Sequence, residues 1–273
     1  MRPVATAAIL PAHKLEAVMS RVAIFVYGIL SYALCLVAFV YAIGFIGGFL
    51  TPTMLDGPAQ RPLGVALSVN VALLVAFALQ HSIMARPAFK RWWTGIIPEA
   101  AERSTYVLAS SIAVGAFFAF WEPIGGVAWQ TEGAVRTAVT GAYLFGWALL
   151  LYVTFLIDHF DLFGLKQVWR QLAGKEYRPP QFYTPSLYKL VRHPLYIGWL
   201  TIFWAAPTMT VSHLVFALVT TAYILFAIRL EERDLVDAFG ADYVAYRART
   251  PMLVPRLPAS GATDVAANSR ART

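Results

Sequence analysis

The chain has 273 residues, of which 59% are hydrophobic and only 14% are charged, and its mean hydropathy is +0.60. Soluble domains carry roughly 25% charged residues, so this composition excludes an ordinary soluble domain and predicts an integral membrane protein. The formal net charge is +7, and in a membrane protein the placement of such cations indicates orientation, not a nucleic-acid partner.

The apolar segments predict the membrane crossings. Residues 1–21 have no sustained apolar core, so we interpret them as a cytosolic leader and not as a cleaved signal. A crossing needs about 20 apolar residues, which predicts spanning helices at 22–50, 63–85, 104–121 and 135–157. The last apolar block, 195–228, is broken by Pro207 and forms either two tilted helices or a hairpin that only partly crosses. The sequence thus predicts an all-α polytopic helical bundle with five or six transmembrane helices.

Lysine and arginine are concentrated in two of the gaps between these segments. One gap carries Arg86, Lys90, Arg91 and Arg103, and the gap at 159–192 carries six more cations. The alternate gaps are poor in cations, since 51–62 has only Arg61 and 122–134 has none. Positively charged loops stay in the cytosol, so both basic gaps and both termini are expected to face the cytoplasm.

This orientation brings polar residues from several helix ends to one level of the membrane. They are Gln80, His81, Arg103, Tyr106, Asp158, His159, Asp161, Arg192, His193, Tyr196, Glu231 and Glu232. A single helix-end histidine or aspartate is more often an interfacial cap than a catalyst. Ionisable groups near membrane depth are costly and usually functional, however, and so many at one depth predict a shared site that faces the cytosol.

The stretch VRHPLYIGW, at 191–199, predicts a ligand-binding helix start. Proline favours the first turn of a helix, so Arg192 and His193 are expected beside the unpaired N–H groups at its N-terminus. Such a position binds an anionic group, for example a carboxylate. Tyr196 lies one turn further and shares their face, and Gly198 leaves room for another backbone or a flat ligand.

Two carboxylates, Glu231 and Glu232, lie where the last predicted helix meets the cytosol. They suit a cationic or hydroxyl-rich ligand, although the one that faces away is expected to pair with a neighbouring arginine. Leu235, Phe239 and Tyr243 follow at i+4 spacing, so an amphipathic cytosolic helix is expected to leave the membrane here.

These C-terminal residues resemble the signature of the integral-membrane methyltransferases, which include isoprenylcysteine carboxyl methyltransferases and bacterial phospholipid methyltransferases. The resemblance rests on Arg192-His193-Pro194, Tyr196, Gly198, Pro207, Glu231-Glu232, Leu235, Phe239-Gly240, Tyr243, Tyr246, Pro251 and Pro255. Three upstream stretches resemble the methanethiol S-methyltransferases, which make dimethyl sulfide. They are QHSIMARPAFKRWW at 80–93, ERSTYVL at 102–108 and DHFDLFGLKQVW at 158–169. The likeness covers most of the chain up to Pro255.

The resemblance implies methylation of methanethiol by S-adenosylmethionine (SAM) at an intramembrane site that faces the cytosol. It leaves hydrogen sulfide open as a second acceptor. The implied cofactor-binding residues are Tyr188, Arg192, His193, Tyr196, Gly198, Glu231, Glu232 and Tyr246. Arg192 and His193 would bind the methionine carboxylate, one glutamate would bind the ribose or the ammonium, and the tyrosines would flank the adenine or the sulfonium. No metal is implied.

The implied domain organisation follows the same likeness. We expect a leader at 1–21, a transmembrane methyltransferase domain at 22–255 whose SAM-binding part is about 186–255, and a disordered tail at 256–273. The expected location is a bacterial-type inner membrane, and the expected partners are a small volatile thiol and membrane lipids. The sequence leaves the oligomeric state open.

The thiol must be deprotonated, because the thiolate is the nucleophile and a free cysteine thiol has a pKa of about 8.5. The candidate catalytic residues are His81, Asp158, His159, Arg103 and Tyr106. We favour His81 and Asp158 as the acid–base pair and Arg103 as the group that stabilises the thiolate. On one helix, Asp158 and Asp161 share a face from which His159 is turned by about 100°, so either the histidine or the aspartates face the site.

Two alternatives stay open. The acceptor of a related methyltransferase would be an isoprenylcysteine carboxylate or a phospholipid amine. A protein of another class would carry haem or protons, but its histidines should face each other across neighbouring helices, and those of this chain do not repeat within one helix. Cys35, the only cysteine, excludes a disulfide framework and a cysteine-based metal site.

Overall fold

The computed structural model describes residues 12–255, with side chains from Ser20 onward. Five helices of this part are long and apolar enough to cross a membrane: α1 (Ala12–Gly47), α2 (Leu63–Ala85), α4 (Glu99–Phe120), α5 (Gly133–Leu156) and α9 (Val211–Phe239). The protein is therefore an all-α, polytopic integral membrane protein. The first helix begins at Ala12, well before the predicted start at residue 22, and the predicted tail at 256–273 lies outside the described residues.

The last apolar block is a hairpin with unequal arms. Its first arm is α8 (Pro194–Trp204), which begins with a proline in its first turn as expected, and its second arm is α9. The 11 residues of α8 span about 16 Å at 1.5 Å per residue, roughly half of the hydrocarbon core. The hairpin therefore crosses only partly through α8, and the described chain has five full-length spans.

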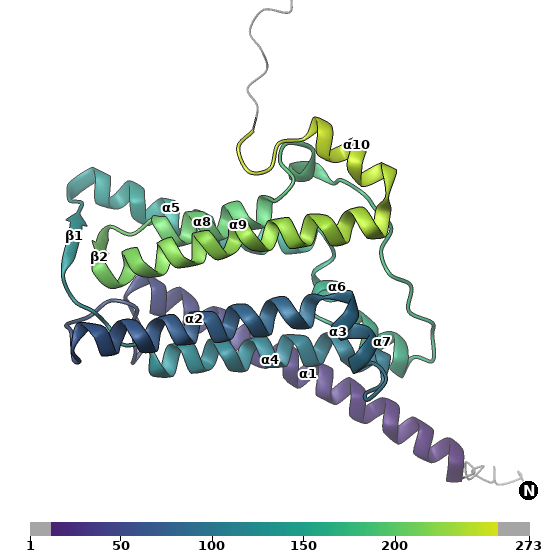
Figure 1. The fold of residues 1–273 in the computed structure, drawn as a ribbon. Helices are drawn as coiled ribbons and strands as arrows, with labels where there is room; N and C mark the ends of the chain where they lie inside the picture. Colours follow the sequence, from purple (N-terminus) through teal and green to yellow (C-terminus); the bar gives the residue numbers. More distant parts are fainter. Residues whose placement is uncertain (1–11, 256–273) are drawn as a thin grey trace, which may run out of the picture.

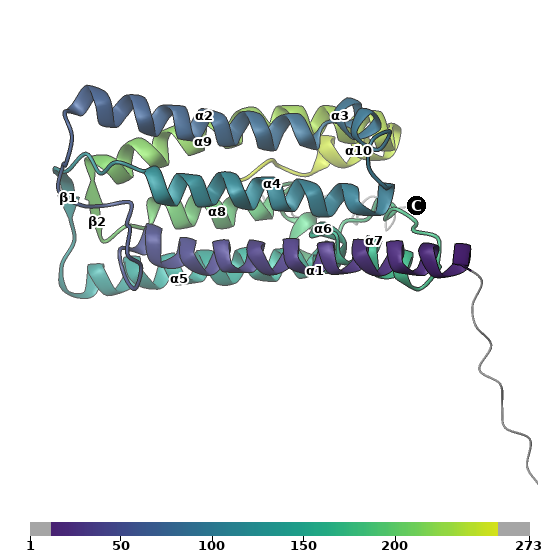
Figure 2. The ribbon, with the colours of Figure 1, turned by 90° about the horizontal axis from the view of Figure 1, so that it is seen from below.

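The long helices form two layers (Figure 1). One layer contains α5, α8 and α9, and the other contains α1, α2 and α4, with α5 packed along α8 and α4 packed along both α1 and α2. Figure 2, viewed from below, shows the long helices side by side along one direction, and Figure 1 shows that α1 is tilted relative to the others. Aromatic rings join the layers, because Phe39 of α1 lies 5.9 Å from Trp199 of α8 and 6.4 Å from Trp147 of α5, measured between ring centroids.

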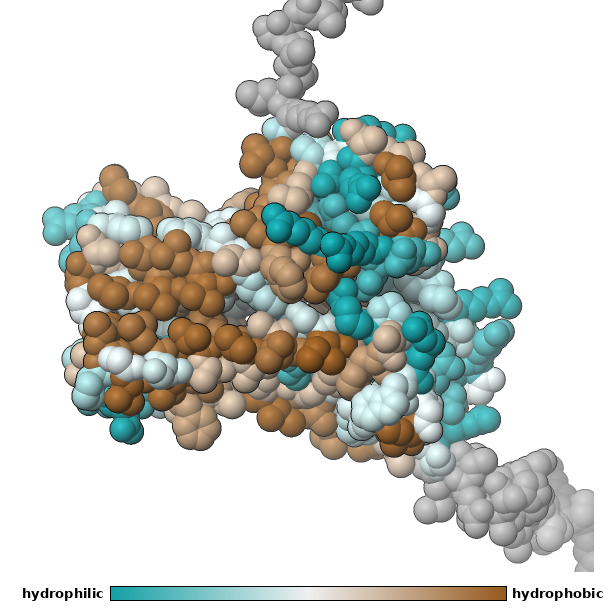
Figure 3. Space-filling model, viewed as in Figure 1, coloured by the Kyte–Doolittle hydropathy of each residue, from teal (hydrophilic) through white to brown (hydrophobic). Residues whose placement is uncertain are grey.

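The two ends of the bundle differ. At one end, β1 (Val127–Gln130) pairs antiparallel with β2 (Thr208–Thr210), a small sheet that the sequence did not predict. The short helices lie at the other end: α3 (Pro87–Trp93), α6 (His159–Leu162), α7 (Leu165–Leu172), the 3-10 turn η1 (Ser186–Lys189) and α10 (Ala241–Arg249). Hydrophilic side chains gather there, while a hydrophobic band covers the long helices (Figure 3). We call this the polar end.

A buried histidine joins elements at the opposite end. His213, which is only 2% exposed, has Nδ1 at 3.2 Å from Oδ2 of Asp56 and Nε2 at 3.0 Å from the carbonyl of Phe203. Each ring nitrogen therefore lies within hydrogen-bond distance of an acceptor oxygen. Thr210 completes the contact by donating its hydroxyl to Asp56 and capping α9. His213 therefore connects the loop after α1 to the α8–α9 hairpin, and it lies far from the polar end.

Candidate active site

Arg192 binds parts of the protein on three sides. Its Nε donates to Oε1 of Glu232 at 2.7 Å, and its Nη1 donates to the carbonyls of Arg247 and Thr250 at 3.1 and 2.5 Å. Its backbone N–H donates to the carbonyl of Pro251 at 2.9 Å. Arg192 therefore joins the start of α8 to α9, α10 and the segment after α10. These contacts brace the C-terminal segment against α8, and the contact of Arg192 with a ligand carboxylate stays a prediction.

His193 and Tyr196 orient the two glutamates. His193 is 5% exposed, and its Nε2 lies 3.0 Å from Oε1 of Glu232, which therefore pairs with two residues of the α8 start. The hydroxyl of Tyr196 donates to Oε2 of Glu231 at 3.0 Å. The side chain of Glu231 is 43% exposed, whereas that of Glu232 is 13% exposed. Glu231 is thus the carboxylate available to a ligand, a choice that the sequence left open.

Gly198 lies against a neighbouring helix. A Cβ at this position would lie 3.2 Å from the backbone nitrogen of Leu150 and 3.3 Å from the carbonyl oxygen of Gly146, both in α5. The glycine therefore permits close approach of two backbones, which is one of the two reasons that the sequence offered for it.

Two tyrosines close the outer side of this cluster. The hydroxyl of Tyr246, in α10, donates to the backbone carbonyl of Tyr188 at 2.6 Å. The Tyr246 ring also packs against those of Phe182 and Tyr243. Burial raises the pKa of Tyr246 to about 12 and also raises the pKa of Tyr188. Both phenols are therefore neutral, and Tyr246 holds α10 against the segment before α8.

A second cluster lies on the other layer, in α2 and α4. The hydroxyl of Tyr106 lies 2.8 Å from Nε2 of His81, and Nδ1 of His81 lies 3.3 Å from Oγ of Ser110. The guanidinium of Arg103 lies over the Tyr106 ring, 4.9 Å from its centroid, and its Nε donates to the carbonyl of Leu162 at 2.7 Å. His81, Tyr106 and Arg103 therefore form one connected group, as the sequence predicted for residues at these helix ends.

Contacts between α2 and α9 hold the two clusters near each other. The hydroxyls of Ser82 and Tyr223 are 3.0 Å apart, and Arg86 forms a 2.8 Å ion pair with Asp234. The His81–Tyr106–Arg103 group and the carboxylate cluster therefore belong to helices that contact each other at the polar end.

Asp158 interrupts the helix that the sequence predicted. It has a φ of +79°, and its Oδ1 accepts the backbone N–H of Asp161 at 3.1 Å as the N-cap of α6, while Oδ2 pairs with Lys166. The expectation that Asp158 and Asp161 lie on one helical face is wrong for this reason. Among the described residues, no hydrogen bond or ion pair joins Asp158 to His81, the favoured partner.

His159 is enclosed by aromatic rings and by α1. Its ring stacks on Phe155 at 4.4 Å, Nδ1 lies 2.8 Å from Oγ1 of Thr154, and Nε2 lies 2.7 Å from the hydroxyl of Tyr32. The Thr154 hydroxyl donates its proton to the carbonyl of Leu151, so it accepts from Nδ1–H, and Nε2 accepts from Tyr32. Burial lowers the pKa of His159, which keeps the ring neutral.

A polar cavity of about 770 Å³ lies beside Arg103, and no sequence pattern predicted it. Residues of α3, of the α4 start, of α6–α7 and of the segment after α7 line it, including Lys90, Asp161 and Tyr177. Tyr177 donates to Oδ2 of Asp161 at 3.2 Å, and burial lowers the pKa of Lys90. The segment that contains Tyr177 has no hydrophobic periodicity, so no pattern could have assigned it to a site.

Comparison with known proteins identifies relatives across nearly the whole chain. The chain is 51% identical to methanethiol S-methyltransferase 2 of Bradyrhizobium diazoefficiens, over 90% of this chain and 95% of the relative. It is 46% identical to methanethiol S-methyltransferase of Mycobacterium tuberculosis, over 87% of this chain and 98% of the relative. Rat nurim is 30% identical over 64% of this chain and 70% of nurim. No protein-family model and no solved structure matches. Identity of this extent shows that the chain belongs to the methanethiol S-methyltransferase family.

Proposed function

We propose that the protein transfers a methyl group from SAM to methanethiol and so produces dimethyl sulfide. Its relatives at 46–51% identity carry the name methanethiol S-methyltransferase. The observation that carries the proposal is the approach of two unlike groups at the polar end. One is the carboxylate cluster of α8 and α9, and the other is the His81–Tyr106–Arg103 group of α2 and α4. The Ser82–Tyr223 and Arg86–Asp234 contacts hold α2 against α9 and bring the two groups to the same end of the bundle.

The carboxylate cluster fits the cofactor by its chemistry. SAM supplies a methyl group on a positively charged sulfur, and it also carries an ammonium and ribose hydroxyls. Glu231 accepts hydrogen bonds from such groups, and Tyr196 holds its carboxylate in place. Arg192 and His193 hold Glu232 in place, and Arg192 also holds the segment after α10, so these residues would shape the site that SAM occupies when bound.

The second cluster manages the proton of the acceptor. A carbon–sulfur bond forms as the thiol sulfur attacks, the bond from the methyl carbon to the sulfonium sulfur breaks, and one proton leaves the thiol. His81 accepts this proton in the proposed scheme, since a neutral imidazole is a general base and its ring nitrogens lie within hydrogen-bond reach of Tyr106 and Ser110. Tyr106 orients the imidazole, and Arg103 stabilises negative charge on sulfur through its position beside Tyr106. Asp158 and His159 serve the structure of the α5–α6 turn in this scheme.

We propose further that the polar end faces the cytoplasm. The cations of α3, α7 and their flanking segments gather there, and the positive-inside rule assigns such loops to the cytosol. SAM is charged and water-soluble, so a site that opens to this side is accessible to it.

The test is methyl transfer by the purified protein in detergent, with labelled SAM, methanethiol and detection of dimethyl sulfide in the headspace. We expect product from the wild type, and a loss of about 10²–10⁴-fold in kcat for His81→Ala, which is the usual contribution of a general base. Glu231→Gln should weaken SAM binding in calorimetry, whereas the matched control Glu132→Gln, at an exposed position before α5 at the opposite end, should not.

Three negative results of this test would contradict different parts of the proposal. Absence of SAM binding by the wild type would overturn the methyltransferase proposal. SAM binding without methylation of methanethiol would overturn the acceptor and favour a lipid or isoprenylcysteine acceptor. Full activity of His81→Ala would exclude His81 as the base.

A further inference from the structure

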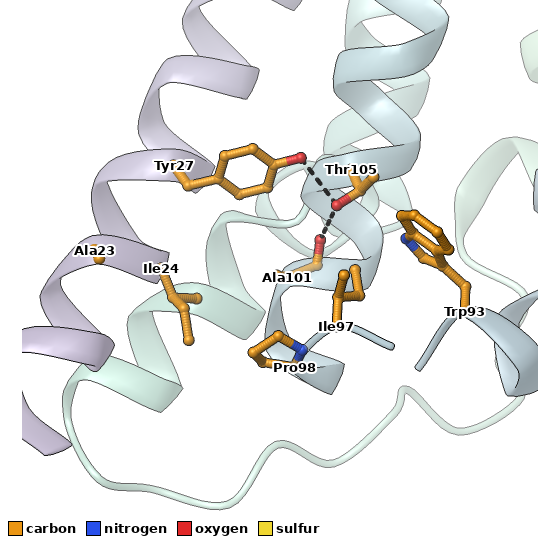
Figure 4. A pocket seen from close by; sticks show the side chains of 8 residues that line it. All are labelled: Ala23, Ile24, Tyr27, Trp93, Ile97, Pro98, Ala101 and Thr105. Carbon is orange, nitrogen blue, oxygen red and sulfur yellow. Dashed lines mark hydrogen bonds between the residues drawn. The ribbon is translucent and has the colours of Figure 1, made fainter. Parts of the chain in front are cut away.

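A groove on the outer surface of the bundle is separate from the site described above (Figure 4). It has a volume of about 350 Å³ and lies between α1 and the α3–α4 connection. Pockets for small ligands have volumes of about 300–1,000 Å³. Ala23 and Ile24 line one wall, and Ile97, Pro98 and Ala101 line the other. The groove is therefore apolar and large enough for a slender ligand.

The hydroxyl groups of the groove are already paired with each other. Tyr27 donates to Oγ1 of Thr105 at 2.9 Å, and Thr105 donates to the carbonyl of Ala101 at 2.9 Å. Figure 4 shows this chain of contacts crossing from α1 to α4. These groups thus fix the spacing of the two helices, and neither hydroxyl has a proton left for a ligand.

Trp93 supplies the one indole donor of the lining. Its Nε1 is buried and has no hydrogen-bond partner among the described residues. In Figure 4 the nitrogen lies on the side of the ring toward Ile97 and Thr105. An indole N–H only donates, and buried donors are normally paired. The groove therefore lacks an acceptor oxygen next to Trp93.

The position of Trp93 at the polar end and the nearby basic residues indicate that a lipid head group supplies the missing acceptor oxygen. Trp93 is the last residue of α3, at the polar end of a membrane-spanning bundle, and the last turn of α3 carries Lys90 and Arg91. Arg91 and its neighbour Trp92 are exposed. Tryptophan and basic residues at this level contact lipid head groups, and basic residues favour anionic ones.

We propose that the groove is a binding site for one anionic phospholipid. An acyl chain lies between α1 and α4, a head-group or ester oxygen accepts the N–H of Trp93, and the phosphate lies near Arg91. The bound lipid fixes α3 against α1. The site holds the lipid without consuming it, and it is independent of the proposed methyl transfer.

The test is native mass spectrometry of the purified protein, delipidated and titrated with phosphatidylglycerol or with phosphatidylcholine. We expect wild-type protein to retain one phosphatidylglycerol more tightly than phosphatidylcholine. Ala23→Trp fills the groove and should abolish this retention. Trp93→Phe removes one hydrogen bond and should weaken it about fivefold. The matched control is Trp129→Phe, because Trp129 is 44% exposed and lies in β1 at the opposite end of the bundle.

Three results would overturn the proposal. Retention of phosphatidylglycerol by Ala23→Trp at the wild-type level would exclude the groove. Equal retention of the two lipids by the wild type would exclude recognition of the anionic head group. Unchanged lipid retention together with a raised KM for methanethiol in Ala23→Trp would assign the groove to the thiol. A monodisperse elution profile for each variant confirms that loss of lipid does not come from unfolding.

Discussion

His159 shows how a residue with catalytic chemistry acquires a structural role. Tyr32 and Thr154 bind its two nitrogens, and the Phe155 ring covers one face of the imidazole. Its neutral form is the one that fits this environment, because aromatic rings surround the imidazole and leave it out of water. A protonated ring would place a charge among these aromatic side chains.

We therefore expect His159 to make the stability of the protein depend on pH. Burial lowers its pKa in the folded state, whereas the unfolded chain has a pKa near 6.5, so the unfolded state binds the additional proton below that pH. Stability is present above pH 6.5 and declines as the pH falls, by at most about 1.4 kcal/mol per pH unit.

The measurement is thermal unfolding in detergent at pH 7.5 and 5.5. The wild type should lose more of its Tm between these values than His159→Gln, which keeps a polar side chain that does not titrate. The remaining titratable groups contribute to both proteins alike. An equal loss in both would show that His159 does not couple folding to pH.

At the scale of elements, the contact between α5 and α8 depends on two glycines. A Cβ at Gly198 would meet the backbone of α5, and one at Gly146 would lie 2.9 Å from Cγ1 and 3.1 Å from the backbone nitrogen of Ile202 in α8. Small residues that let helix backbones approach closely are typical of membrane-helix interfaces. The start of α8 carries Arg192 and His193, so this packing also positions the candidate site.

Gly198→Ala and Gly146→Ala should each lower the Tm, since backbone atoms cannot yield as a flexible side chain would. Gly141→Ala is the matched control, because it lies in α5 and a Cβ there has no neighbour within 4 Å. That change should be neutral or stabilising by up to about 1 kcal/mol, the difference in helix propensity. A Tm for Gly198→Ala equal to that of Gly141→Ala would contradict the close approach.

The helices with long apolar runs could be predicted from the sequence. The backbone conformations and residue roles that depend on particular side-chain contacts could not. The predicted span 63–85 coincides with α2, because an uninterrupted apolar segment must satisfy its backbone as a helix in lipid. The left-handed backbone of Asp158 carries no such signal. Arg192 donates to the carbonyls of Arg247 and Thr250, at the end of α10 and just after it. Residue spacing within α8 predicts which side chains of that helix share a face, but it does not predict that α10 packs against Arg192.

At the scale of the whole molecule, the described part of the chain has five full-length spans, yet its first helix begins and its last helix ends at the polar end. The α8 arm is short, but it and α9 form a hairpin connected through β2 at the end opposite the polar end. The segment before α8 therefore starts from the polar end, and α9 returns to it. α3, α7 and α10 all lie there, so the cations of these helices face one compartment.

This arrangement predicts opposite accessibility for two exposed positions in whole bacterial cells. Arg178, whose side chain is 84% exposed, lies in the segment after α7, and Gln60 is exposed in the loop before α2 at the other end. A membrane-impermeant maleimide should label Gln60→Cys in intact cells and Arg178→Cys only after lysis. The unmodified protein is a matched control, because Cys35 is buried at 7% exposure and should stay unlabelled in both conditions. Labelling of Arg178→Cys in intact cells would reverse the orientation, and the charged methyl donor would then have no access to the candidate site from the cytoplasm.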